Sequence, residues 1–105
     1  MIPRIKQKNN HLKEMATVGT MDDFTILVYT DHDPSHFHLL KNGEFEAKIN
    51  IETLEVFDYK FQKNGKTVSG SYLRKLKRWL EKKSLRNSKI TNKEAIQFSW
   101  QILNS

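Results

Sequence analysis

The chain has 105 residues, 37% of them hydrophobic and 29% charged, which is enough for one globular domain but too few for two. It contains no cysteine, and this excludes disulfides, thiolate metal sites and cysteine nucleophiles. No apolar run approaches the roughly 20 residues of a membrane span, and no apolar signal-peptide region follows the basic amino terminus. We therefore expect a single cytoplasmic domain over residues 1–105 that does not associate with a membrane.

The net charge of +6 is unevenly distributed along the chain. Residues 70–89 contain eight cations and one acid, whereas residues 14–69 contain five cations and ten acids. This layout favours a nucleic acid or an acidic protein as a partner of the basic segment.

Residues 1–23 are predicted to form a partly ordered basic arm. The first 13 residues carry four cations and no acid, and Asn9-Asn10, Gly19 and Asp22-Asp23 interrupt regular structure.

Residues 24–69 predict an antiparallel meander of three or four strands. The first strand is the β-branched and aromatic run from Phe24 to Tyr29. Asn42-Gly43 is a strong hairpin signal, and the strand after it alternates, with one face formed by Phe45, Ala47, Ile49 and Ile51.

The register of this hairpin decides which face receives the histidines. A two-residue turn places His36 and His38 on the core face. A three-residue loop, Lys41-Asn42 followed by left-handed Gly43, instead directs Phe37 and Leu39 into the core and exposes His36 and His38 beside Glu44 and Glu46. We expect the second register, because it buries the phenylalanine and exposes the imidazoles.

Two helices are expected at the carboxyl end. The first covers about residues 71–86, with an apolar stripe and an opposite basic face formed by Arg74, Lys77, Arg78 and Lys82. The second begins at the capping box Thr91-Asn92-Lys93-Glu94. Its two apolar sides suggest a homodimer through the C-terminal helix. The expected fold is α+β, with both helices packed on one face of the meander.

The segment Asp31-His32-Asp33-Pro34-Ser35-His36-Phe37-His38 holds three of the four histidines and is the candidate site. One hypothesis is a divalent transition metal such as zinc, because imidazole and carboxylate are suitable ligands. The candidate ligands are Asp31, His32, Asp33, His36 and His38.

A second hypothesis is acid–base catalysis of RNA cleavage by His32, His36 and His38, since imidazoles exchange protons near neutral pH. The basic helix would then hold the phosphates. A third is purely structural, with the aspartates capping a turn and the histidines bonding to backbone carbonyls.

The loop, together with Asn42-Gly43-Glu44-Phe45-Glu46-Ala47 and the strand after it, resembles a bacterial domain-of-unknown-function family. The signature of that family is an Asp-His-x-Pro-x-His-Phe-His loop, and the resemblance covers roughly residues 24–83. The chain differs from the family pattern at Ser35, where a second proline is common, and at residues 66–71, which look like an insertion before the helix. The resemblance implies a toxin–antitoxin-like role with another small partner, and it implies no reaction. Together with the basic helix, it leads us to expect a small module that is nucleic-acid-associated or protein-partnered. A histidine-based or metal-dependent ribonuclease is the alternative.

Overall fold

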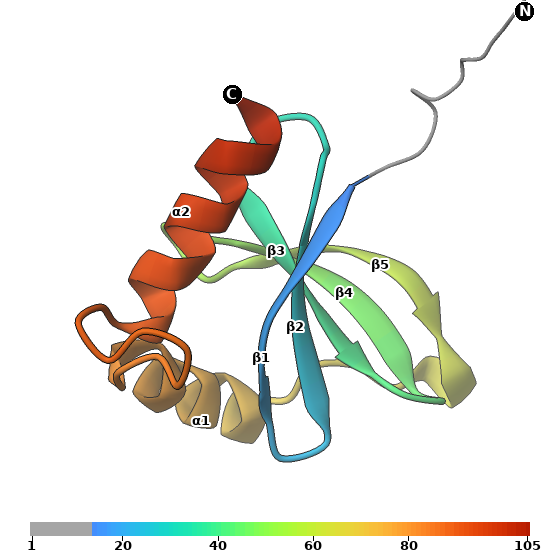
Figure 1. Ribbon diagram of the computed structural model, residues 1–105. Helices are drawn as coiled ribbons and strands as arrows, with labels where there is room; N and C mark the ends of the chain where they lie inside the picture. Colours follow the sequence, from blue (N-terminus) through green and yellow to red (C-terminus); the bar gives the residue numbers. More distant parts are fainter. Residues whose placement is uncertain (1–13) are drawn as a thin grey trace, which may run out of the picture.

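A computed structural model describes residues 14–105 and shows one antiparallel sheet with two helices (Figure 1). The strands follow one another across the sheet in chain order. The elements are β1 (Met15–Met21), β2 (Phe24–Tyr29), β3 (His36–Lys41), β4 (Phe45–Asn50), β5 (Val56–Gln62), the short 3-10 turn η3 (Lys63–Gly65), α1 (Gly70–Glu81) and α2 (Asn92–Asn104). The predicted α+β class is confirmed, but the predicted three or four strands are wrong because there are five.

The additional strand is β1, which falls where a partly ordered arm was expected. It pairs with β2 from Met15↔Tyr29 to Met21↔Phe24, and the register shifts between Thr17 and Gly19. Gly19 did not break the strand, because the missing side chain makes room for the indole of Trp79 on α1: a Cβ there would lie 2.9 Å from the ring. Residues 1–13 of the predicted arm lie outside the described residues.

The register of β3 and β4 determines which side chains face the helices. Lys41 pairs with Phe45, so the loop is Asn42-Gly43-Glu44, and Gly43 has a φ of 80° as its left-handed position requires. The predicted three-residue loop, Lys41-Asn42-Gly43, began one residue too early. Moving the loop by one residue shifts the pairing of the two strands by two residues. Each side chain therefore stays on its predicted face, since strand side chains alternate with a period of two.

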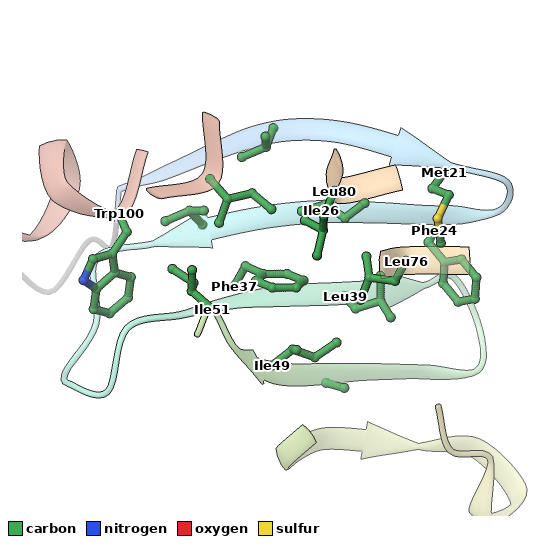
Figure 2. Close-up of a cluster of buried hydrophobic side chains, with 14 of the residues drawn as sticks. Met21, Phe24, Ile26, Phe37, Leu39, Ile49, Ile51, Leu76, Leu80 and Trp100 are labelled. Atoms are coloured by element: carbon green, nitrogen blue, oxygen red, sulfur yellow. The ribbon is translucent and has the colours of Figure 1, made fainter. Parts of the chain in front are cut away.

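The hydrophobic core lies between the sheet and both helices. Figure 2 shows side chains from β2, β3 and β4 meeting Leu76 and Leu80 of α1 and Trp100 of α2, with Trp100 at one end of the cluster and Met21 and Phe24 at the other. Because Leu76, Leu80 and Trp100 belong to this one cluster, both helices cover the same face of the sheet, as expected. Each fully buried aliphatic or aromatic side chain contributes about 1.5–3 kcal/mol to the free energy of folding.

The first helix ends earlier than predicted, at Glu81 rather than near Arg86. Lys82 is extended, with φ −77° and ψ 156°, and its carbonyl accepts a hydrogen bond from the Asn92 amide. The connection between the helices then doubles back, with Lys83 pairing with Thr91 in an isolated bridge. These backbone bonds replace the last predicted helical turn.

The outer side of α2 retains exposed apolar residues. Phe98 is 48% and Ile102 is 76% exposed, whereas Ala95 packs against the core. The homodimer through this helix stays a prediction. Within residues 14–105, no helix combines the length and the apolar character needed to cross a membrane.

The predicted capping box at Thr91 is present, and we expect it to contribute to the stability of α2. The Thr91 hydroxyl accepts from the Glu94 amide at 3.1 Å, and the Glu94 carboxylate accepts from the Thr91 amide at 2.9 Å. Thr91→Ala should lower the free energy of unfolding by about 1 kcal/mol in urea denaturation. Thr91→Ser, which keeps the hydroxyl, should lower it by less than half as much, and equal losses would contradict this role.

Candidate metal centre

Three potential ligands gather where the β2–β3 loop enters β3. Asp31 lies in that loop, and His36 and His38 lie on the face of β3 opposite to Phe37 and Leu39. One ligand atom from each residue falls within 4.8 Å of the other two. This is the part of the candidate segment that the structure brings together.

His38 presents a buried nitrogen that has no partner. Its Nδ1 lies 2.9 Å from Glu46 Oε2 on β4, and its Nε2 is buried without a hydrogen-bond partner. A carboxylate accepts a hydrogen bond, so Nδ1 carries the hydrogen and Nε2 keeps its lone pair. Burial lowers the pKa of His38 from 6.5 to about 4 and outweighs the opposing effect of Glu46, so the ring is neutral at pH 7.

His36 is held in a matching way by the backbone of its own loop. Its Nδ1 donates to the Pro34 carbonyl over 2.7 Å, and its Nε2 faces Asp31 Oδ2 at 3.1 Å. Two arrangements satisfy the contact with Asp31: a hydrogen on Nε2, or a cation bound by both the nitrogen and the carboxylate.

Aromatic side chains cover the two imidazoles, and the prediction that these rings are exposed is wrong. His36 and His38 are each only 2% exposed. The ring centroid of His36 lies 5.0 Å from that of Trp100 and 5.4 Å from that of Phe57, and Tyr29 packs edge-on against His38 at 4.4 Å. These residues come from β2, β5 and α2, so the cover forms only in the folded chain.

The last turn of α2 fixes the loop that carries Asp31. The Asn104 side chain accepts from the Asp31 amide at 2.8 Å and donates to the Tyr29 carbonyl at 3.1 Å. Figure 1 shows the C-terminal end of α2 beside this loop. The position of Asp31 thus depends on a residue 73 positions away in the sequence.

The chemistry and spacing of these groups fit a divalent transition metal ion. Imidazole nitrogen and carboxylate oxygen bind zinc at about 2.0–2.2 Å, which places tetrahedral ligand atoms about 3.4 Å apart. The Asp31–His36 contact of 3.1 Å is already near that spacing, and the remaining separations are at most 4.8 Å. In both histidines the other ring nitrogen donates to an oxygen, as is usual for histidines that bind metal.

Two other predicted ligands lie outside this cluster. His32 and Asp33 are exposed, and the structure places neither with the three residues that face one another. The supporting roles of Asn104, Trp100 and the Pro34 carbonyl had no signal in the sequence. Glu46 was expected near the histidines, but its hydrogen bond to His38 was not predicted.

The predicted anion-binding residues lie at the opposite end of the molecule. Arg74, Lys77 and Arg78 are exposed on α1, and Lys82 is exposed directly after it, not within the helix as predicted. This helix meets the β1–β2 turn, where Lys75 pairs with Asp22 at 3.3 Å, whereas His38 pairs with Leu27, towards the other end of β2. A ribonuclease site that uses both groups on one phosphate finds no support in this arrangement.

The buried, neutral His38 predicts a pH-dependent stability in metal-free protein. Its pKa of about 4 in the folded chain is below the ordinary 6.5, so between these values the unfolded chain binds more protons. The stabilisation is complete above pH 6.5 and is lost as the pH falls towards 4, by about 3 kcal/mol at most. Urea denaturation with a chelator present measures this.

His38→Gln should remove most of this slope, and His32→Gln should leave it unchanged because His32 is exposed. The assignment to His38 would be overturned by a His38→Gln variant whose stability depends on pH as strongly as that of the original protein.

Comparison with known proteins identifies the family but adds no function. The family model described as Domain of unknown function (DUF4160) matches residues 23–86, which include β2 to β5, the candidate ligands and α1. No curated protein and no solved structure matches the chain. The match covers more than half of the 105 residues, and the chain therefore belongs to the DUF4160 family of domains of unknown function.

Proposed function

We propose that the protein binds one divalent transition metal ion, such as zinc, through Asp31, His36 and His38. The observation that carries this proposal is the buried Nε2 of His38, which has no partner while Glu46 holds Nδ1. An unpaired buried polar atom costs about 1–3 kcal/mol, and a metal ion in the cluster removes that cost.

The enclosure of the cluster favours a structural role for the ion. A metal bound by these residues connects the β2–β3 loop to β3, and through Asn104 and Trp100 this region is also joined to α2. Binding to the folded chain alone stabilises it by mass action. Three protein ligands leave one tetrahedral position for water or another ligand.

Zinc titration of the metal-free protein tests this function. We expect one ion per chain by isothermal titration calorimetry and a higher melting temperature with zinc. His38→Ala, His36→Ala and Asp31→Ala should each weaken binding by at least about 100-fold, because each removes a ligand from a three-residue site. His32→Ala is the matched control and should bind as tightly as the original protein.

Adventitious binding gives a different pattern. If His36→Ala and His38→Ala bind zinc as tightly as the original protein, or if His32→Ala removes binding, the proposed centre is wrong.

A second candidate function, nucleic-acid binding by α1, is favoured by an exposed row of cations. Within residues 14–105, no ion pair joins Arg74, Lys77, Arg78 or Lys82 to an acid. Arg78 and Lys82 line a surface hollow of about 230 Å³ with Lys75. Phosphates gain affinity from such cations through counterion release. The toxin–antitoxin-like role implied by the resemblance uses the same face if the partner is an acidic protein.

Charge reversal on α1 tests the second candidate. Combining Arg74→Glu with Arg78→Glu should weaken the binding of labelled single-stranded RNA by at least about tenfold at low salt in fluorescence anisotropy. Lys63→Glu combined with Lys66→Glu makes the same charge change outside α1 and should have a much smaller effect. Equal losses would contradict a specific surface, and RNA that does not bind the original protein would leave the acidic protein as the partner to test.

A further inference from the structure

We propose that Lys48 is a resident cation that competes with the metal ion for Asp31 and thereby sets the metal affinity of the centre. The inference rests on the proposed metal-binding function. Lys48 Nζ lies 3.7 Å from Asp31 Oδ2, the same oxygen that faces His36 Nε2 at 3.1 Å. One carboxylate oxygen therefore serves both the candidate ligand set and a lysine.

Strand pairing holds Lys48 at this position. Lys48 lies directly opposite His38 in the β3–β4 ladder, on the face of the sheet that carries the histidines. Its side chain is largely covered, as is that of Asp31. The ammonium therefore approaches the centre because of the register, and its charge balances a carboxylate that is mostly removed from water.

A second carboxylate gives the ammonium another place to bind. Asp58 lies opposite Lys48 in the β4–β5 ladder, and its Oδ2 is 3.8 Å from Lys48 Nζ. The two distances are nearly equal, so the ammonium lies between the two carboxylates and can lose Asp31 while it keeps Asp58. Asp58 belongs to no candidate ligand set in the described chain.

The charges determine the direction of this exchange. A divalent ion on Asp31 repels an ammonium a few ångströms away, and the repulsion is strong in a partly buried site. The ion therefore drives Lys48 to Asp58, and part of its binding free energy is used to displace the lysine. Lys48 weakens metal binding, and Asp58 strengthens it by receiving the lysine.

Opposite effects on zinc affinity follow from these roles. Lys48→Met should tighten zinc binding about tenfold, the scale on which residues next to metal ligands act. Lys48→Arg keeps the charge and should stay close to the original affinity. Asp58→Asn should weaken binding about threefold in the original protein, and it should have almost no effect when Lys48→Met is also present.

Calorimetric titration with zinc against a competing chelator measures all four variants, and Lys63→Met controls for the loss of one positive charge elsewhere on the chain. Melting curves without metal confirm that each variant is folded. If the original protein and Lys48→Met bind zinc with equal affinity, the proposed role of Lys48 is wrong, but the metal centre itself is not contradicted. An Asp58→Asn effect that persists without Lys48 leads to the same conclusion, because it reveals only the loss of a negative charge. Zinc binding by none of these proteins overturns the metal centre itself and, with it, this inference.

Discussion

The pairing of Lys41 with Phe45 fixes which face of the sheet each side chain of β3 and β4 occupies. It sends Phe37 and Leu39 towards the helices and His36 and His38 to the other face. The same register brings Lys48 opposite His38 and leaves Glu46 within hydrogen-bond distance of its ring. A slip by one residue would move the imidazoles into the core, whose buried side chains in the described part of the chain are hydrophobic. The candidate centre therefore depends on this hairpin.

A buried polar cluster on the second face of a sheet is costly unless its groups find partners. Here the Pro34 carbonyl and Asp31 contact the two nitrogens of His36, and Glu46 accepts from one nitrogen of His38. The two carboxylates are in turn paired with lysines, Asp31 with Lys48 at 3.7 Å and Glu46 with Lys60 at 3.4 Å. The Tyr29 ring packs on His38. Burial, and to a smaller extent the negative charge of Glu46, raises the pKa of the Tyr29 hydroxyl, so the ring that covers His38 stays uncharged. The one nitrogen left without a partner points to an ion, and the ammonium of Lys48 lies beside the oxygen that such an ion would use.

Local patterns in the sequence predicted the features that depend on neighbouring residues. Alternation after Gly43 identified the apolar face of β4, and the Thr91–Glu94 box marked the start of α2. The strand β1 was missed because its short uncharged run resembles a loop, and its stability comes from pairing with β2 and packing under Trp79. Helix α1 was extended too far because the bridge between Lys83 and Thr91 leaves no periodic signal.

The candidate site shows the same division. The composition of the loop identified Asp31, His36 and His38, but His32 and Asp33 look equivalent to them in sequence and differ only in where the folded loop directs them. Burial of the histidines could not be predicted, because Trp100, Phe57 and Asn104 reach the loop from distant positions. The distance between the basic helix and the histidines could not be predicted either, because it depends on how the complete sheet is assembled.

Histidine-resolved nitrogen NMR tests the central claim most directly, because it reports which ring nitrogen holds a lone pair. In metal-free protein at pH 7, His38 should be a neutral ring with hydrogen on Nδ1 and an unprotonated Nε2. One equivalent of zinc should shift the Nε2 signals of His36 and His38 together and leave His32 unchanged. A His38 ring that carries its hydrogen on Nε2, or zinc-induced shifts confined to His32, would contradict the proposed centre.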